Sequence, residues 1–549
     1  SRILRVLLTG SRSPYAALMV FSVMLLADYL FRIYLFPLYN NFLLKIGASP
    51  VWSDLDVGFA PIVWLSFFAI ILGSLTIVIT FASQNVPKLI DLYMDHWPSL
   101  FFVWWAAACL IHAFTIKIFS EAGVEIVSSL IFNYHVLLAV SLVIGFPFVL
   151  SILKSTKTSN VIENLLEGSY AKFKRLAKKG PKGIISPEEH AKIQYQLFEE
   201  LNQLMDLLVF VPYKEPKSQI IEGIGELLRY YVKLKPKFPE DFYKICQQIR
   251  DDISFRTLKS LLVEVEKSHT FYEQKSFRMI GNVYNVFLDK GEFDLSTLCV
   301  EQLSQVGKTA MECDDQELIE VITVRLNTYF RFALKHGQHN NEPRNLYNLV
   351  FHYGQFLSYM VEHRQVERVK TCIGYFVFYG QQCFNVIPRA RSLAFILDIL
   401  VSEMQKLMMM IYQNNWERKL QQELLQKFLL FDNFQDMNKE IAIQFFSQNH
   451  GIRLLHIGLA LFYLNQNEKE FAEKIAKDTL QDLSLLGEPL FSKTMDTIFA
   501  RLQYSGAKFW EDTDRGNVNI YYTPYQYEIE YFKKIQVKFK HESQKKIPA

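Results

Sequence analysis

The sequence predicts an all-α protein with a four-span transmembrane helical domain and a large helical cytoplasmic domain built from stacked, solenoid-like helix pairs. Three observations lead to this fold class. Long apolar runs crowd the first 153 of the 549 residues and do not recur afterwards. From residue 188 onward, apolar residues return at three- and four-residue spacing, as on one face of a helix. Alternating, strand-like stretches are nearly absent before the carboxyl-terminal tail.

The four apolar runs have the length of membrane-spanning helices. They cover residues 14–39, 61–82, 98–119 and 130–153. A helix crosses the hydrocarbon core with about 20 mostly apolar residues, each adding about 1.5 Å. The second run, PIVWLSFFAIILGSLTIVITFA, contains no charged residue. We therefore predict a transmembrane domain over residues 1–155.

The charges beside these runs predict their orientation. Lysine and arginine are enriched in short loops on the cytoplasmic side. The loop between the third and fourth runs is acidic, with Glu121 and Glu125. The two outer flanks are basic and carry Arg2, Arg5, Arg12, Lys154 and Lys157. Both termini are therefore expected in the cytoplasm.

Residues 156–190 are predicted to form a basic juxtamembrane linker, punctuated by glycine and proline. Basic clusters close to a membrane contact anionic lipid head groups, with about 1 kcal/mol per charge. The same charges also enforce topology, and the sequence leaves both roles open. The candidate head-group contacts are Lys172, Lys174, Arg175, Lys178, Lys179 and Lys182.

Residues 191–505 are predicted to form the helical cytoplasmic domain. The clearest unit, residues 458–480, contains two helices around a polar turn at 465–467, with small residues as in tetratricopeptide-type packing. Gly291 and Gly337 precede similar helices, 46 residues apart, which is typical of a helical repeat. An irregular helical bundle is the alternative. Apolar and polar residues tend to alternate in residues 506–549, and this pattern predicts a carboxyl-terminal arm or hairpin.

Composition and motifs argue against several function classes. The net charge of +3 gives nucleic-acid binding no global electrostatic support. The six cysteines include no C-x-x-C pair and are predicted to be free thiols. The chain has no glycine-rich phosphate loop, no G-x-S-x-G and no H-E-x-x-H. We therefore predict no enzyme activity and no cofactor.

A polar segment at residues 336–345 contains two histidines near a carboxylate. His336, His339 and Glu342 have a spacing that metal sites use. A metal site needs three or four convergent ligands, and this segment offers no fourth ligand. The sequence therefore favours a capping loop, with Asn340 or Asn341 capping the next helix, and predicts no metal.

Four polar residues inside the apolar runs are the candidate functional residues. Asp28 and Arg32 are four residues apart and share one helical face. His112 and His135 lie in the third and fourth runs. Ionisable groups within a bilayer are costly, form pairs and mark ion or proton pathways. An intrahelical pair, or a contact with a neighbouring span or subunit, is the structural alternative.

The segment SLTIVITFASQNVPKLIDLYMD, residues 74–95, resembles a family of uncharacterised bacterial membrane proteins with four amino-terminal spans and a helical soluble domain. The positions that fit the family pattern are Ser74, Thr76, Val78, Ala82, Ser83, Pro87, Lys88 and Leu89, with Lys88 replacing the usual arginine. SILKSTKTSNVIENL, residues 151–165, is similar to the exit helix of the family.

A further motif of that family, Asn-Asp-Pro followed by threonine, is only partly present. In GEFDLSTLCVEQL, residues 291–303, Asp294 and Thr297 remain, and Leu295 stands in place of the proline. The resemblance covers roughly the first 310 residues. It implies the architecture and a bacterial inner-membrane location, and it carries no known activity.

These observations lead to one expected function and one alternative. The expected function is a membrane-anchored helical scaffold that presents a cytoplasmic protein-interaction surface, as a subunit of a larger inner-membrane assembly. Its expected partners are the lipid bilayer and another protein, or a second copy of the chain, and no nucleic acid. The alternative is a homo-oligomeric ion channel or transporter, with Asp28, Arg32 and His112 as pore or gate residues.

Overall fold

In a computed structural model, the chain divides into two compact units. The membrane unit contains Ser1–Gly168 and Glu199–Ile220, and the repeat unit contains Ser169–Phe198 and Ile221–Ala549. The helices α9 (Thr158–Lys179), α10 (Pro187–Phe210) and α11 (Lys214–Leu234) run at or across this division. The structure describes residues 13–47, 56–85, 97–124, 126–145, 157–252, 255, 260–432, 440, 443, 445, 449–513 and 516–544.

The apolar runs form long helices in the membrane unit. These helices are α2 (Ser13–Leu30), continued by η1 (Phe31–Leu35) and α3 (Phe36–Lys45), then α4 (Phe59–Asn85), α6 (Trp97–Glu121), and α7 (Val127–Ile131), continued by η3 (Phe132–Leu137). Among the described residues, three stretches are long and apolar enough to cross a membrane: Leu18–Lys45, Phe101–Glu121 and Val127–Gly145. The predicted four spans exceed this number by one, and the described apolar stretch of α4 is Phe59–Ser74.

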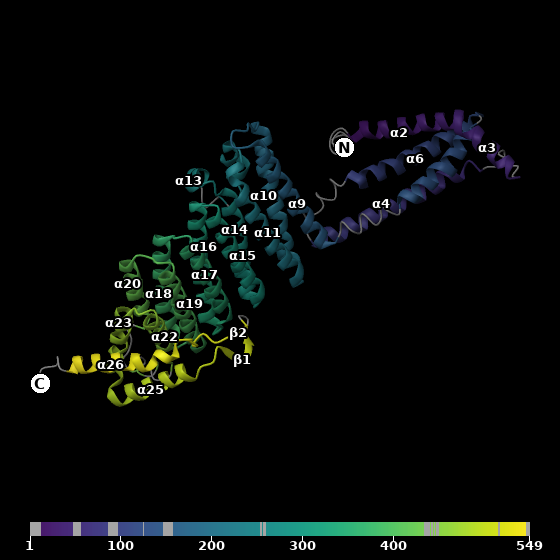
Figure 1. Cartoon of the computed structure of the whole chain (residues 1–549). Coiled ribbons are helices and arrows are strands. Elements are labelled where there is room, and N and C mark those ends of the chain that lie inside the picture. Colours follow the sequence, from purple (N-terminus) through teal and green to yellow (C-terminus); the bar gives the residue numbers. More distant parts are fainter. Residues whose placement is uncertain are drawn as a thin grey trace. The chain divides into compact units, whose positions relative to one another are not determined.

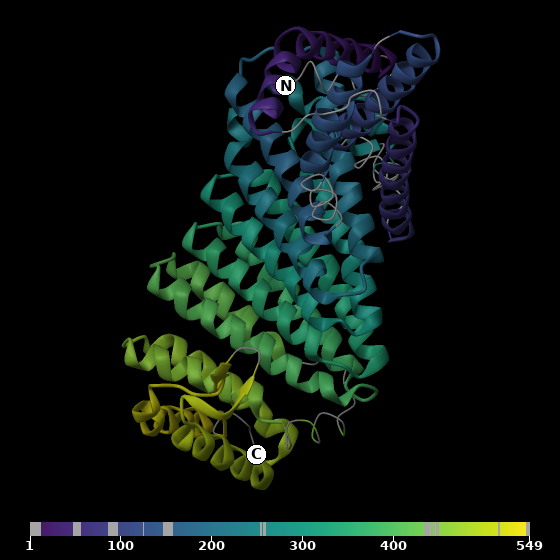
Figure 2. The same cartoon turned by 90° about the vertical axis from the view of Figure 1, so that its right-hand side faces the viewer.

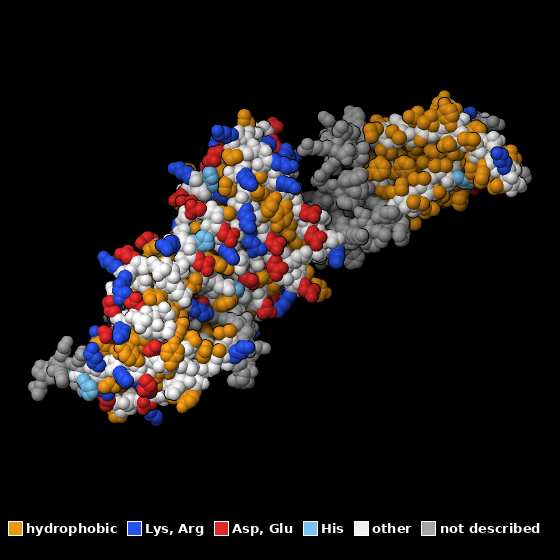
Figure 3. All heavy atoms as spheres, viewed as in Figure 1, with side chains coloured by type: hydrophobic (Ala, Val, Ile, Leu, Met, Phe, Trp, Pro, Cys, Tyr) orange, Lys and Arg blue, Asp and Glu red, His pale blue; other side chains and the backbone are white. Residues whose placement is uncertain are grey.

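The membrane unit exposes many large apolar side chains, and its core includes several small residues as well as large ones. Ala60, Ala108, Cys109 and Ala113 are buried where the helices meet. Small residues allow transmembrane helices to approach closely. Leucine, isoleucine, valine and phenylalanine side chains of α2, η1, α3, α4 and α6 include many that are exposed, and Figure 3 shows hydrophobic side chains over much of the visible face of these helices. An exterior of this kind suits contact with lipid.

The repeat unit is built from stacked helices, as Figure 1 and Figure 2 show. One row contains α15 (Phe293–Glu312), α17 (Arg344–Glu362), α19 (Ala394–Gln413) and α22 (Gly451–Asn465). A second row contains α14 (Phe271–Lys290), α16 (Gln316–Asn340), α18 (Val366–Val386) and α20 (Arg418–Leu429). Neighbouring helices within each row are in contact, and α14, α16 and α18 each pack on the helix of the other row that follows them in the chain. The predicted all-α fold with stacked helix pairs is confirmed.

Short elements complete this unit. Before the repeats these are η4 (Lys235–Lys237), η5 (Glu240–Tyr243), α12 (Gln247–Arg250) and α13 (Leu262–Lys267). Within and after the repeats they are η7 (Arg391–Leu393), η8 (Leu430–Asp432), α23 (Lys469–Thr479), α24 (Gln481–Leu486), α25 (Glu488–Tyr504), β1 (Lys508–Thr513), β2 (Gly516–Val518), η9 (Gln526–Glu528) and α26 (Ile529–Gln544).

One turn recurs between successive helix pairs. It places a residue other than glycine in the left-handed conformation, at His269, Asp314, Arg364, Asn415 and Asn467. The next backbone N–H then bonds to the carbonyl oxygen five residues earlier, as from Gln365 to Met360 (2.9 Å) and from Glu468 to Tyr463 (2.8 Å). This is the Schellman arrangement that ends helices. A repeat of 45 to 52 residues therefore underlies the array.

The pairing of Gly291 with Gly337 as repeat markers was wrong. Gly291 ends α14 in the left-handed conformation, but Gly337 is buried inside α16. The residue that ends α16 in this way is Asn341, with φ 52°. Asparagine adopts this conformation more readily than most residues, so no glycine marks the position. The same finding corrects the predicted capping loop, because His336 and His339 belong to the last turns of α16.

Two other predicted segments are more helical than expected. The basic linker predicted over residues 156–190 is mostly helix α9, which buries Val161, Ile162, Leu165, Phe173 and Leu176 at helical spacing. In the tail, β1 and β2 form an antiparallel hairpin, but α26 occupies residues that alternation assigned to an arm or hairpin.

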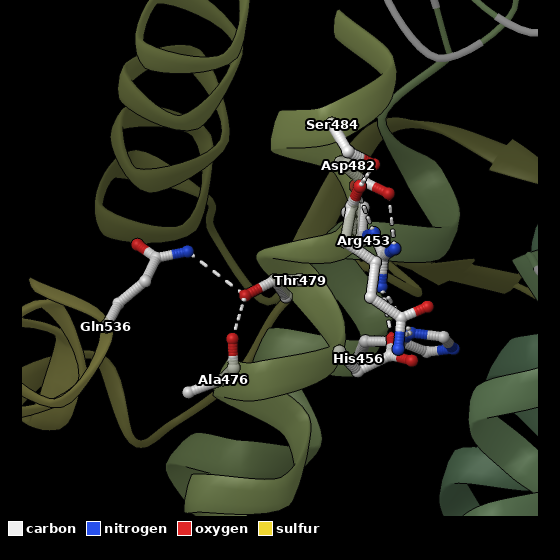
Figure 4. A network of polar contacts seen from close by, with 9 residues as sticks. Arg453, His456, Ala476, Thr479, Asp482, Ser484 and Gln536 are labelled. Carbon is white, nitrogen blue, oxygen red and sulfur yellow. Dashed lines mark hydrogen bonds and ion pairs between the residues drawn. The ribbon is translucent and has the colours of Figure 1, made fainter. Parts of the chain in front are cut away.

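Helix α26 is held against α23. The side-chain amide of Gln536 donates to Thr479 Oγ1 (3.0 Å), which itself donates to the carbonyl oxygen of Ala476, as Figure 4 shows. In the same view Arg453 of α22 reaches Asp482 of α24. These contacts join the carboxyl-terminal helices to the last repeat.

Candidate functional site

A buried hydrogen-bond network joins the four helical segments of the membrane unit. Its centre is the Asp28 carboxyl group of α2. Asp28 Oδ2 accepts a hydrogen bond from Ser129 Oγ of α7 (2.7 Å) and lies 3.3 Å from His112 Nε2 of α6. The His112 ring is almost completely buried. The structure therefore places two of the predicted intramembrane residues, Asp28 and His112, in direct contact.

The other side of His112 faces Asn133 of η3. Asn133 Nδ2 lies 3.1 Å from His112 Nδ1, and Asn133 Oδ1 accepts a hydrogen bond from the indole N–H of Trp64 in α4 (2.7 Å). The indole nitrogen can only donate, so it fixes the orientation of the Asn133 amide. The Asn133 NH₂ group then donates to His112 Nδ1, which must be unprotonated. The proton of neutral His112 is therefore on Nε2 and points at Asp28.

Two π-helical segments adjoin the network. η1 begins three residues after Asp28, and η3 contains Asn133. π-Helical turns are rare and often occur at functional sites. His135 also lies in η3, but its Nδ1 is 2.8 Å from the hydroxyl of Tyr39, so it belongs to a separate contact.

Among the described residues, the structure shows no ion pair between Asp28 and Arg32. Arg32 is exposed and lies in η1. The contacts that the structure gives Asp28 come from His112 and Ser129 on other helices. Sequence reasoning missed Ser129, Asn133 and Trp64. Of these, Asn133 gave a usable signal, because it is a polar residue inside an apolar run.

The predicted head-group contacts lie on α9 and just after it. Lys174, Arg175, Lys178 and Lys182 are exposed. Arg175 and Lys179 form ion pairs with Glu189 of α10, so part of their charge is already compensated. The pairing with these lysine and arginine groups lowers the pKa of Glu189. A role in lipid binding stays a prediction.

A groove lies between α16 and α18, and it was not predicted from the sequence. Its volume is about 820 Å³. Its arginines are Arg331, Arg364 and Arg368, and its other lining residues are Glu320, Thr323, Val324, Asn327, Thr328, Gln365, Val366, Glu367, Thr371, Tyr375 and Tyr379. The residues that line the groove come from two helices about one repeat apart in the sequence. The stacking of these helices brings the residues together.

The three arginines of this groove differ in their contacts. Arg368 is held by Glu320 and by the side chains of Gln316 and Gln365. Arg364 contacts the backbone carbonyl of Asn414 at 3.3 Å, and Arg331 lies over the ring of Phe332. Among the described residues, Arg331 and Arg364 form no ion pair. The groove thus presents two guanidinium groups beside exposed Val324 and Tyr375.

The histidine segment at the end of α16 does not assemble a metal site. His336, His339 and Glu342 line a shallow hollow beside the α14–α15 turn. Glu342 accepts a hydrogen bond from the backbone N–H of Arg344 (2.9 Å). Within the described residues, no three histidine, cysteine, aspartate or glutamate side chains converge as metal ligands do.

Comparison with known proteins identifies no relative: no family model, no curated protein and no solved structure matches this chain.

Proposed function

We propose that the protein is a membrane-anchored scaffold whose repeat unit binds an acidic segment of a partner protein in the groove between α16 and α18. The observation that carries this proposal is the pair of guanidinium groups, Arg331 and Arg364, that have no acidic partner among the described residues. In this proposal the membrane unit crosses a bacterial inner membrane four times and holds the repeats in the cytoplasm.

The length of α4 supports the fourth crossing. Its 27 residues extend about 40 Å as a helix, which exceeds the hydrocarbon thickness of about 30 Å. An even number of spans, together with the basic flanks at Arg2, Arg5, Arg12, Lys154 and Lys157, favours cytoplasmic termini. The bacterial location rests on the resemblance of residues 74–95 to the bacterial family.

The chemistry of the groove favours an acidic segment with an apolar or aromatic anchor. The guanidinium group presents a planar set of donors that matches a carboxylate. Val324 and Tyr375 are 56% and 39% exposed and offer apolar contact in the lining of the groove. Binding residues of this kind, arginine and tyrosine, are enriched at the energetic centres of protein interfaces. Helical-repeat proteins use extended surfaces of this sort for recognition.

Site-specific crosslinking in native membranes tests the proposal. A photoreactive amino acid at Tyr375 is expected to crosslink a partner through an acidic segment, which mass spectrometry of the crosslinked peptide identifies. Replacing Arg331 and Arg364 by glutamate should abolish the crosslink. Arg391→Glu, an exposed arginine of η7 outside the groove, is the matched control and should leave the crosslink intact. A crosslink that survives the double charge reversal, or that maps to a basic segment, contradicts the proposal.

A further inference from the structure

The network of the membrane unit leaves one buried atom unsatisfied, Oδ1 of Asp28. The other oxygen, Oδ2, receives both Ser129 and His112. Oδ1 is inaccessible to solvent and has no hydrogen-bond partner in the part of the chain that the structure describes. A buried polar atom without a partner is costly, and a bare carboxylate within a bilayer is more costly still. The carboxylate form of Asp28 therefore carries a free-energy cost that its two hydrogen bonds at Oδ2 do not remove.

His112 cannot supply the missing positive charge without breaking the network. A second proton on His112 would sit on Nδ1 and face the NH₂ group of Asn133. Rotating the Asn133 amide would turn that NH₂ group toward the indole N–H of Trp64, and two donors would then face each other. The chain of contacts from Trp64 through Asn133 thus keeps His112 neutral, and the charge of Asp28 stays unbalanced.

The other charged groups of the packed helices do not balance this charge either. On α6, Lys117 pairs with Glu121 at 4.0 Å near the end of the helix. On η1, Arg32 is exposed, and on η3, His135 contacts Tyr39. Helix α4 contains no charged residue. Within the described residues, no cation contacts the Asp28 carboxyl group.

We propose that Asp28 is an intramembrane proton-binding site, in which Oδ1 takes up one proton and His112, Ser129 and Asn133 are positioning residues. The step converts a carboxylate and a proton into a neutral carboxyl group, so no further reactant is required. Oδ2 keeps its two hydrogen bonds in both states. The two π-helical segments beside the site, η1 and η3, support a functional rather than a purely structural role.

The ligand is a proton rather than a metal cation because of the atoms available. Hard metal cations take six or more oxygen ligands. Here a single oxygen, Oδ1, is free, because the donors His112 Nε2 and Ser129 Oγ both contact Oδ2. The buried side chains of the surrounding helices are mostly apolar. A proton needs only the one oxygen. This inference concerns the membrane unit and does not depend on the groove of the repeat unit.

Infrared spectroscopy of the full-length protein in lipid vesicles tests the proposal. Protonated carboxyl groups have a carbonyl stretching band that carboxylates lack. At about pH 8, where exposed carboxyl groups are ionised, we expect such a band in the native chain. The band should shift in D₂O, disappear in Asp28→Asn and persist in Glu121→Gln, whose carboxyl group is exposed at the end of α6. Identical spectra for the native chain and Asp28→Asn overturn the proposal.

A second measurement avoids any dependence on the folding of the variant. The protein is produced with aspartate that carries ¹³C at the side-chain carboxyl carbon. The label shifts the carbonyl band of every protonated aspartic acid. Burial raises the pKa of Asp398 only to about 6, so that group is ionised at about pH 8 and does not contribute. The buried carboxyl group of Glu273 is not labelled. A labelled native chain without a shifted protonated band also overturns the proposal.

Discussion

The hydroxyl group of Tyr521, in the segment between β2 and η9, donates a 2.7 Å hydrogen bond to Asp398 Oδ2 in α19. The two residues are 123 positions apart in the sequence, so this contact ties the carboxyl-terminal segment to the body of the repeats. Burial raises the pKa of Asp398 to about 6, although the hydrogen bond from Tyr521 and the charge of Arg501 act in the opposite direction.

Replacing Asp398 by asparagine should stabilise the repeat unit at neutral pH. The pKa of Asp398 is higher in the folded chain than in the unfolded chain, where it is about 3.9. The folded state therefore holds an extra proton between about pH 4 and 6, and stability falls as the pH rises through that window. Asp398→Asn should remove this loss and raise the free energy of unfolding of the repeat unit by about 1–3 kcal/mol at about pH 7.5. Hydrogen exchange of α19 amides across this pH range measures the effect.

The exposed Asp496 of α25 provides the control for this prediction. Asp496→Asn removes the same charge from a position that water solvates, so the free energy of opening should stay within about 0.5 kcal/mol of the native value. Equal effects of the two substitutions would show that burial of Asp398 is not the cause.

Close packing of α15 on α17 makes Gly307 sensitive to a single methyl group. A Cβ atom at Gly307 would overlap the ring of Phe356, which is fully buried. Overpacking of this kind costs about 1–3 kcal/mol. Gly307→Ala should therefore destabilise the repeat unit, measured as faster hydrogen exchange in α15 and α17.

Gly374 of α18 gives the opposite result for the same substitution. A Cβ atom there meets no other atom within 4 Å, and its backbone is helical. Alanine is favoured over glycine in a helix by about 0.5–1 kcal/mol. Gly374→Ala should stabilise α18 slightly. If both variants are stabilised, the contact between Gly307 and Phe356 does not limit packing.

The sequence predicted the helices better than it predicted their contacts. Length and apolar character are local properties, so the spans and the helical repeats were visible along the chain. In α26, Ile529, Phe532, Ile535 and Phe539 are buried at spacing close to that of a helix. Tyr531 and Val537 add an alternation of apolar and polar residues, which is typical of a strand. The packing of α26 on α23 favours the helix.

The intramembrane site was only half visible in the sequence. Asp28 and His112 drew attention because ionisable residues are rare in apolar runs. Their partners come from other helices, and the separations range from 21 residues for His112 and Asn133 to 101 for Asp28 and Ser129. Such contacts depend on helix packing, which spacing along one chain does not reveal.

The buried ion cluster around Arg453 should be far more important for stability than a similar exposed cluster. Arg453 binds both carboxyl oxygens of Asp482 and one of Asp478, each at 2.6 Å, and its side chain is 6% exposed. Removing one partner of a buried ion pair costs about 3–5 kcal/mol, because the remaining charges stay buried. Arg453→Met should lower the free energy of opening of α22–α24 by this amount, as hydrogen exchange measures.

Arg418 is the matched control, since it also binds two carboxylates of the following helix segment. It contacts Glu468 at 2.8 Å and Glu470 at 2.9 Å, but its side chain is 51% exposed. Exposed ion pairs contribute about 1 kcal/mol or less. Arg418→Met should therefore have a small effect. A loss as large as that of Arg453→Met would mean that burial does not determine the difference.

His456, next to Arg453, should make the last repeat sensitive to acid. Its ring is fully buried, and burial together with the positive charge of Arg453 lowers its pKa from 6.5 to about 3. As the pH falls from about 6.5 toward 3, the unfolded chain binds a proton at this position that the folded chain does not bind. Stability therefore falls with falling pH, by at most about 1.4 kcal/mol per pH unit.

Replacing His456 by phenylalanine tests this dependence directly. His456→Phe should flatten the decline in the free energy of opening of α22 between about pH 6.5 and 5, where most carboxyl groups are still ionised. His363→Phe, at an exposed position after α17, should keep the native slope. Hydrogen exchange at several pH values, corrected for the intrinsic exchange rate, provides the comparison. If His456→Phe retains the native slope, other groups cause the acid sensitivity of this repeat.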